Sequence, residues 1–406
     1  MKPTRRVLLA GAALAPSLPA AAQQRPPARP APRPGQASPP REPPGSPANT
    51  PIGAFNTQAR HALIIDFETG ATLLDKESDV LMAPASMSKL MTAYVVFEML
   101  REGRLKLDQE LPVSRRAWQM GGSKMFVDIG TTVRVDDLLR GVIIQSGNDA
   151  CIVLAEAISG SEEGFADLLN ERARAIGLTR SSFRNATGWP DPQHRMTCRD
   201  LATLAGHIIR DFPEFYPIYS EKSFKYQIAH AQENRNPLVQ RGTGDGLKTG
   251  HTEESLYGLT GSSKRGERRV ILVMNGLPSM RVRAEEADRL MDWAFREFDN
   301  AVLFAEGQTV EQAPVWLGAQ RSVALVPERK LTVTVPRGWR QSAEAKVVYD
   351  SPIRAPIAKG QRIGTLRMSG QGVPALDVPL VAGHDVAEAG FMDRVTQAFR
   401  ARLTGG

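Results

Sequence analysis

Cysteine and histidine are scarce in this chain, which has 2 cysteines and 6 histidines among 406 residues. The histidines are scattered without metal-ligand spacing, so we expect no metal site and no cofactor. Cys151 lies in an apolar run and should pack as a small hydrophobic side chain. Export can lead to a disulfide, but we favour free thiols at Cys151 and Cys198.

Long apolar runs are also missing: beyond residue 22 no stretch is long enough for a transmembrane helix. The first 22 residues combine a basic start, a short apolar run over 7–15 and small residues at 20–22, which is typical of a secretory signal peptide. The pair Arg5–Arg6 fits a twin-arginine signal and an ordinary signal about equally well. We therefore expect an exported, periplasmic protein.

The part of the chain expected to fold carries little net charge, although the whole chain carries +7. Most of the excess comes from the first 22 residues and from residues 23–51, where four arginines accompany one glutamate. A near-neutral remainder argues against a nucleic-acid partner. Residues 23–51 contain 11 prolines, which predicts an extended Pro-rich linker.

The first of three polar motifs is Ser86-Met87-Ser88-Lys89. Pro84 suits a helix start, and apolar residues then recur at helical spacing. A serine and a lysine three residues apart lie on one helix face, about one turn apart. An adjacent amine could therefore activate the hydroxyl of Ser86, although most lone motifs of this kind are solvated helix surface.

Two further motifs follow: Ser146-Gly147-Asn148, which we expect on a tight connection between two helices with Gly147 supplying backbone freedom, and Lys248-Thr249-Gly250. The order S-x-x-K, S-x-N, K-T-G is that of active-site-serine β-lactamases and penicillin-binding proteins. With the flanks 84–92 and 245–252, the chain resembles the serine D-Ala-D-Ala carboxypeptidases, the low-molecular-mass penicillin-binding proteins. The resemblance runs from about residue 62 to 295 and continues more weakly to the C-terminus.

The resemblance implies an acyl-enzyme mechanism. Ser86 would be the nucleophile and Lys89 the base, provided that its amine is neutral, which burial or a second cation such as Lys248 would favour. Ser146 would relay a proton to the leaving amine, and Asn148 would hold a substrate carbonyl or Lys89. The alternative for Ser146 and Asn148 is a helix-capping pair.

Substrate binding would fall to the third motif. Lys248 and Thr249 would bind the terminal carboxylate, and Gly250 would let an extended substrate approach the strand. The backbone N–H groups of the nucleophile and of His251 would form the oxyanion hole, while the His251 side chain has a direct, tuning or structural role. Arg199 matches a family arginine that supports carboxylate binding, although a helix-start salt bridge also explains it.

The order of elements predicts an α/β (α+β) fold like that of serine β-lactamases and DD-peptidases, with an antiparallel sheet covered by helices, over residues 52–298. Strands are expected at 61–66, 71–74, 256–262 and 269–274, and helices at 135–139, 150–158, 165–176 and 283–298. Alternating residues at 331–335 and 376–380 predict a small β-sandwich-like domain over 299–384.

Residues 385–406 are expected to form an amphipathic helix, centred on 387–403. Its apolar face consists of Phe391, Met392, Val395, Ala398, Phe399 and Leu403. Because family members often end in a membrane anchor, we expect this helix to lie on the outer face of the inner membrane. The alternative is a helix docked on the β domain.

The leading prediction is a carboxypeptidase that removes the terminal D-alanine from peptidoglycan stem peptides and that β-lactams acylate. A β-lactamase, a DD-endopeptidase with the same residues and a non-enzymatic penicillin sensor or wall-binding module are the alternatives. The added β domain and terminal helix argue against a diffusible β-lactamase, and the intact motifs argue against a sensor.

Overall fold

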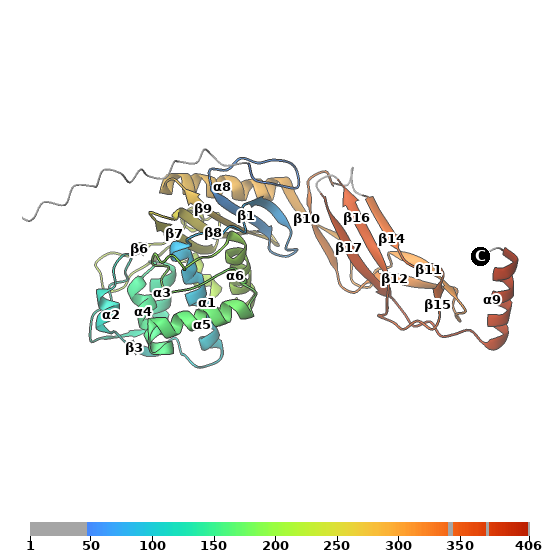
Figure 1. The fold of residues 1–406 in the computed structure, drawn as a ribbon, viewed down its shortest axis with the longest axis horizontal. Coiled ribbons are helices and arrows are strands. Elements are labelled where there is room, and N and C mark those ends of the chain that lie inside the picture. Colours follow the sequence, from blue (N-terminus) through green and yellow to red (C-terminus); the bar gives the residue numbers. More distant parts are fainter. Residues whose placement is uncertain (1–46, 340–343, 371–372, 405–406) are drawn as a thin grey trace, which may run out of the picture. The chain divides into compact units, whose positions relative to one another are not determined.

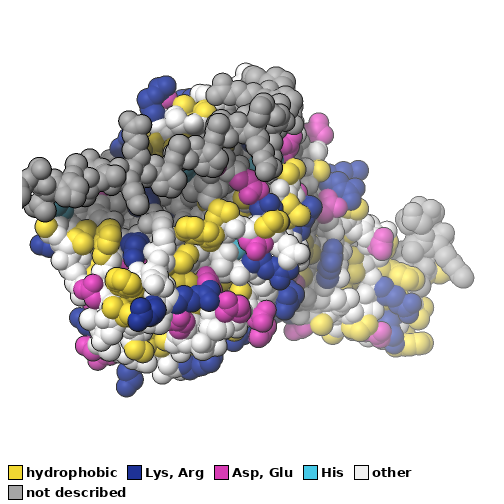
Figure 2. Space-filling view, turned by 60° about the vertical axis from the view of Figure 1, so that its left-hand side comes forward, with side chains coloured by type: hydrophobic (Ala, Val, Ile, Leu, Met, Phe, Trp, Pro, Cys, Tyr) yellow, Lys and Arg dark blue, Asp and Glu magenta, His cyan; other side chains and the backbone are white. Residues whose placement is uncertain are grey.

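The computed structural model describes residues 47–339, 344–370 and 373–404 (Figure 1). The predicted signal peptide (1–22) and the predicted linker up to residue 46 lie outside the described residues. Cys151 and Cys198 are both buried free thiols, as expected. On the face shown in Figure 2, basic and acidic side chains are interspersed.

An antiparallel sheet forms the centre of the first folded region. Its strand order is β2-β1-β9-β8-β7, and every neighbouring pair is antiparallel. The strands are β1 (His61–Asp66), β2 (Thr72–Lys76), β7 (Gly246–Thr252), β8 (Leu256–Arg265) and β9 (Arg268–Leu277). The predicted antiparallel sheet is confirmed, and the four predicted strands end within three residues of the observed ones.

Helices cover both faces of this sheet, with α8 above it in Figure 1 and α1 and α6 below. The helices are α1 (Lys89–Arg101), α2 (Arg115–Gln119), α3 (Val135–Ile143), α4 (Asn148–Ser159), α5 (Glu162–Ala175), α6 (Cys198–Asp211), α7 (Pro237–Arg241) and α8 (Met280–Glu297). Two 3-10 turns, η1 (Ala85–Ser88) and η2 (Tyr216–Ser220), and the short strands β3 (Glu110–Pro112), β4 (Thr132–Arg134), β5 (Ser223–Phe224) and β6 (Gln232–Glu233) complete the region.

The apolar run of β9 shows why both faces need a cover. Ile271 and Val273 pack among the helices that include α1 and α4, whereas Leu272 and Met274 pack under α8. Successive strand residues point to opposite faces, so a strand buried on both sides must be apolar throughout. Full burial of one such side chain contributes roughly 1.5–3 kcal/mol.

A buried ion pair lies where the first strand after α8 begins. Arg268 Nε lies 2.9 Å from Asp66 Oδ2, and its guanidinium also donates to the carbonyl oxygens of Ala294 and Phe298. Asp66 Oδ1 accepts from the amide of Asn300 at 3.1 Å. Asp66 at the end of β1 thereby binds β9 and the first strand of the C-terminal region, and its hydrogen bonds compensate the burial of two charges.

The C-terminal region is built from strands with their own core, as predicted. β10 (Phe298–Phe304) pairs with β13 (Leu331–Pro336), and a second sheet has the order β14-β16-β17-β12-β11-β15. The strands of that sheet are β11 (Glu311–Trp316), β12 (Ser322–Pro327), β14 (Glu344–Val348), β15 (Ile353–Arg354), β16 (Arg362–Gly370) and β17 (Val373–Ala382). Val386 belongs to its core and pairs with Ile357, so this region extends past residue 384.

The last helix, α9 (Phe391–Thr404), turns its apolar side chains outward. Phe391 is 72% exposed, and Met392, Val395 and Phe399 are exposed as well. The contact with the β region is polar: Gln397 Oε1 accepts from the backbone of Leu317 at 2.9 Å. The predicted face positions Ala398 and Leu403 have side chains outside the described set. Within the residues that the structure describes, no helix is long and apolar enough to cross a bilayer.

Candidate active site

Ser86 and Lys89 meet at the junction of η1 and α1. The expected helix begins as a 3-10 turn that contains Ser86, and Lys89 is the first residue of α1. This places Lys89 Nζ 2.9 Å from Ser86 Oγ. Ala85, directly before Ser86, has φ of 48°, a left-handed conformation that is costly for a residue with a Cβ.

The amine of Lys89 is buried, with 1% of the residue exposed. It also lies 2.7 Å from Asn148 Oδ1 and 2.6 Å from the carbonyl oxygen of Thr187. Burial, with the positive charge of Arg235 acting in the same direction, lowers the pKa of Lys89 to about 8. A large fraction of Lys89 can therefore be neutral at mildly alkaline pH.

The second motif lies in the connection between α3 and α4. Its tight turn is confirmed, but the residue in the left-handed region is Ser146, with φ of 61°, and not Gly147. Gly147 is needed for space, because an added Cβ would lie 2.9 Å from Asp149 Oδ1 and 3.1 Å from the backbone nitrogen of Met125. The capping alternative is wrong, because Gly147 is the N-cap of α4 and no side chain caps it.

Asp149 fixes the segment that faces this motif, a role that the sequence did not reveal. Its carboxylate accepts from the backbone N–H groups of Met125, Phe126 and Val127 at 2.8–3.2 Å. The backbone N–H of Asn148 donates to Ser123 at 2.7 Å. Residues 121–127 are thus tied to the start of α4 beside the amide that holds Lys89.

The third motif lies on β7, the edge strand of the sheet. Lys248 and Thr249 are buried. A Cβ added at Gly250 would lie 2.7 Å from the carbonyl oxygen of Pro84 and 3.2 Å from Cβ of Ala85. Gly250 therefore lets η1 approach the strand closely, and the expected approach of a substrate at this residue stays a prediction.

Several cations surround Lys248. Burial lowers its pKa well below the usual value, and Lys89, Arg235 and Arg283 lower it further. Arg283 in α8 is only 5% exposed, and its Nε is buried with no hydrogen-bond partner among the described residues. Neither arginine lies in a recognisable motif, so only the fold identifies them. Such a concentration of positive charge suits an anionic ligand.

Two residues that were predicted to bind the substrate, His251 and Arg199, have side chains with other contacts than the cations around Lys248. His251 is exposed and packs against Tyr257, its partner across β7 and β8, with ring centroids 4.0 Å apart. Arg199 lies at the start of α6, where its guanidinium binds Asp79 and Asp75 at 2.8–3.1 Å. The structure therefore favours the helix-start salt bridge for Arg199, and does not bring it to the lysine cluster.

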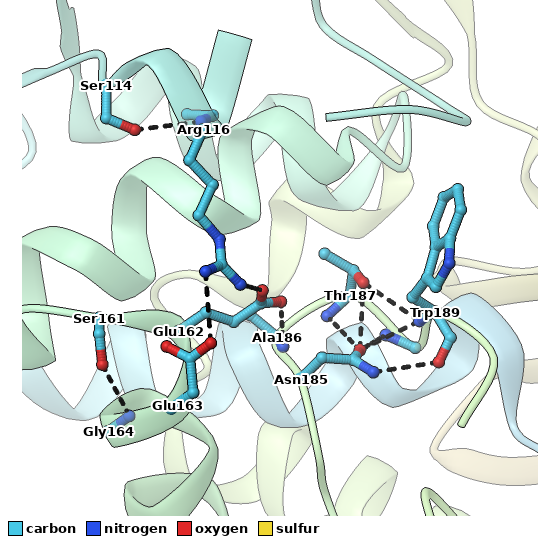
Figure 3. Close-up of polar contacts among 12 residues, drawn as sticks. Ser114, Arg116, Ser161, Glu162, Glu163, Gly164, Asn185, Ala186, Thr187 and Trp189 are labelled. Atoms are coloured by element: carbon cyan, nitrogen blue, oxygen red, sulfur yellow. Dashed lines mark hydrogen bonds and ion pairs between the residues drawn. The ribbon is translucent and has the colours of Figure 1, made fainter. Parts of the chain in front are cut away.

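A tight turn over residues 185–189 supplies the carbonyl that binds Lys89. Asn185 Oδ1 accepts from the backbone N–H groups of Thr187, Gly188 and Trp189 at 2.8–3.1 Å (Figure 3). The carboxylate of Glu162 accepts from the backbone of Ala186 at 3.1 Å. This turn is a further part of the site that no motif indicated.

Comparison with known proteins agrees with this arrangement. Residues 47–278 match the D-alanyl-D-alanine carboxypeptidase family, and residues 298–388 match the family described as penicillin-binding protein 5, C-terminal domain. The chain belongs to the D-alanyl-D-alanine carboxypeptidase family. It is thus a serine peptidase, a hydrolase that removes a terminal D-alanine.

Individual relatives of this carboxypeptidase cover most of its length. D-alanyl-D-alanine carboxypeptidase DacC of Escherichia coli is 36% identical over 85% of this chain and 88% of its own. Penicillin-binding protein 5 of Haemophilus influenzae has a TM-score of 0.73 and 36% identity over 81% of this chain and 98% of its own. Penicillin-binding protein D2 of Listeria monocytogenes, in its ampicillin-bound form, has a TM-score of 0.54 and 28% identity over 58% and 97%.

Proposed function

We propose that Ser86 is the nucleophile and Lys89 the general base of this carboxypeptidase. The observation that carries the proposal is the position of Lys89 Nζ among three oxygens, Ser86 Oγ, Asn148 Oδ1 and the Thr187 carbonyl. A neutral amine has two N–H donors and one lone pair. Since the amide and carbonyl oxygens can only accept, they take both donors and leave the lone pair facing the hydroxyl of Ser86.

The reaction then follows from the proton positions. Lys89 takes the proton of Ser86 as its oxygen attacks the carbonyl carbon, and the resulting ammonium is the source of the proton that the leaving D-alanine amine needs. Ser146, in the α3–α4 connection beside Asn148, relays that proton. Water hydrolyses the acyl-enzyme in the second half of the reaction, with Lys89 again acting as base.

The terminal carboxylate of the substrate binds at the cation cluster of β7. Lys248 supplies charge, Thr249 a hydroxyl donor, and Arg283 and Arg235 add to the positive field. We do not assign Arg199 to this role, because two carboxylates already bind its guanidinium.

The backbone N–H groups of Ser86 and His251 form the oxyanion hole. The support is the close approach of η1 to β7, in which Gly250 contacts Pro84 and Ala85. Ser86 directly follows Ala85 and His251 directly follows Gly250, which supports the assignment of their two N–H groups. Two converging backbone donors are the usual means of stabilising a tetrahedral oxyanion.

β-Lactams should acylate Ser86, because they present a strained amide beside a carboxylate to the same groups. The test is intact-mass spectrometry after penicillin treatment, together with D-alanine release from diacetyl-L-Lys-D-Ala-D-Ala. A stable adduct together with D-alanine release supports the proposal. Rapid turnover of penicillin would favour the β-lactamase alternative, and preferential cleavage of cross-linked dimers would favour an endopeptidase.

We further propose that the protein is exported to the periplasm and that α9 lies on the membrane surface. The basic, apolar and small-residue pattern of residues 1–22 supports export. The outward apolar side chains of α9 support the membrane contact, since a helix docked as a structural element would bury that face.

A further inference from the structure

The indole of Trp189 forms an exposed apolar surface beside the catalytic cluster. The residue is 46% exposed, and its ring lies over two consecutive glycines. A Cβ added at Gly121 would lie 3.5 Å from Cη2 of Trp189, and one added at Gly122 would lie 3.1 Å from Cζ3. Both glycines are themselves exposed, so the ring and the bare backbone form one open shelf.

This shelf lies next to the side-chain amide of Asn148, which binds Lys89. The same added Cβ at Gly122 would lie 2.8 Å from Nδ2 of Asn148, and that nitrogen donates to the carbonyl oxygen of Gly121 at 2.8 Å. The single oxygen of this amide, Asn148 Oδ1, accepts from Lys89. One N–H of the Asn148 amide is left for a substrate carbonyl.

Hydrogen bonds with the side chains of Asn185 and Glu162 fix the turn that carries Trp189. Asn185 Oδ1 accepts from three successive backbone N–H groups and Asn185 Nδ2 donates to the Trp189 carbonyl at 3.0 Å. Glu162, itself paired with Arg116, holds Ala186. Figure 3 shows the indole pointing away from this network. A ring fixed in this way loses little entropy on contact with a ligand.

The direction of the substrate follows from the proposed function, on which this inference rests. With the terminal carboxylate at Lys248 and the scissile carbonyl at Ser86, the acyl part extends from Ser86 past Asn148. The side chain of the residue before D-Ala-D-Ala then reaches the shelf. A flat, half-exposed indole that has no charged partner among the described residues favours methylene groups.

We propose that Trp189 is a specificity residue that packs against a long aliphatic side chain, such as that of a diamino acid, at the position before D-Ala-D-Ala. The residue takes no part in the chemistry. It raises kcat/KM for substrates with such a side chain relative to substrates that have a methyl group there.

The test compares two soluble substrates, diacetyl-L-Lys-D-Ala-D-Ala and acetyl-L-Ala-D-Ala-D-Ala. Trp189→Ala should lower the ratio of their kcat/KM values on the order of tenfold, the usual scale for lost apolar contact in a substrate site. Trp189→Phe should retain most of the ratio, because it retains an aromatic face. Trp118→Ala, which removes another exposed indole from α2, is the matched control and should leave the ratio as it is.

An unchanged ratio in Trp189→Ala, or an equal loss on both substrates, would overturn the inference, since the latter indicates a structural role. Thermal unfolding of each variant shows whether it folds. Failure of the proposed function is a separate outcome: wild-type protein would then release no D-alanine from either substrate and gain no penicillin adduct.

Discussion

The Nζ of Lys89 lies 2.6 Å from the carbonyl oxygen of Thr187, a residue 98 positions later in the chain. This contact fixes the orientation of the base from a turn that contains none of the three motifs. Together with Asn148 it occupies the donors of the amine, so that the lone pair of neutral Lys89 faces Ser86. The geometry therefore supports the proposed assignment of neutral Lys89 as the base.

The first prediction is a pH profile. Lys89 acts as a base only when neutral, and burial lowers its pKa to about 8. The rate of acylation by penicillin should therefore rise with pH through this value and level off above it. Lys89→Arg cannot lose its proton and should show no such rise, with acylation slower by ~10²–10⁴-fold. Stopped-flow measurements across pH 6–10 test this (a range set by the lysine pKa shift).

A matched variant moves the profile in a known direction. In Asn148→Asp a carboxylate replaces the amide oxygen next to the ammonium, which stabilises the charged form and raises the pKa of Lys89. The rising limb should shift to higher pH. A wild-type profile without a rise in the alkaline range, or a limb unmoved in Asn148→Asp, contradicts the assignment of Lys89.

The second prediction separates carboxylate binding from chemistry. Lys248→Ala and Arg283→Ala should reduce kcat/KM for a free-acid substrate on the order of ten- to a hundredfold, because a hydrogen bond to a charged group contributes about 1.5–3 kcal/mol. The C-terminally amidated analogue should lose much less. Arg199→Ala is the control and should leave this discrimination unaltered. Equal losses on acid and amide would refute carboxylate recognition.

The third prediction concerns the buried pair between β1 and β9. Asp66→Ala leaves the guanidinium of Arg268 buried without its carboxylate, which should cost about 3–5 kcal/mol of unfolding free energy. Asp292→Ala breaks an exposed pair with Arg265 and should cost less than about 1 kcal/mol. Chemical denaturation measures both. Similar values for the two variants would show that the Asp66 pair contributes no more than a surface contact.

The fourth prediction concerns α9. Deletion of residues 391–406 keeps Val386 and Ala389, which are buried with the β region. The truncated protein should hydrolyse a small soluble peptide normally but bind anionic vesicles more weakly, because Phe391, Met392, Val395 and Phe399 are lost. Phe391→Ser with Phe399→Ser should act in the same direction. Unchanged co-sedimentation with vesicles after deletion would mean that α9 is a structural element.

The sequence was sufficient to predict that Ser86, Lys89 and Asn148 lie together and to predict the main layers of the fold. The reason is local: the spacing from Ser86 to Lys89 is about one helical turn, and the apolar run at 269–274 is enough to indicate a strand. The prediction from the sequence was least complete where segments that are distant in the chain meet. Arg235, Arg283 and Thr187 reach the site from a loop, α8 and a tight turn, and nothing in their neighbouring residues indicates that position.

Glycines show the same limit. Their positions in the motifs suggested that Gly147 supplies backbone freedom and that Gly250 admits a substrate. In the fold both must be glycine because another segment lies close by. A Cβ added at Gly147 would lie 3.1 Å from the backbone nitrogen of Met125, and one added at Gly250 would lie 2.7 Å from the carbonyl oxygen of Pro84. Whether a glycine serves conformation or close packing depends on contacts with residues far away in the chain.

The most direct test of the account is the mass of the Ser86→Ala variant after incubation with penicillin. The wild-type chain should gain the mass of one penicillin, and Ser86→Ala should gain none and release no D-alanine, while retaining the wild-type circular dichroism spectrum. A folded Ser86→Ala protein that still acquires the penicillin mass would show that the nucleophile is another residue.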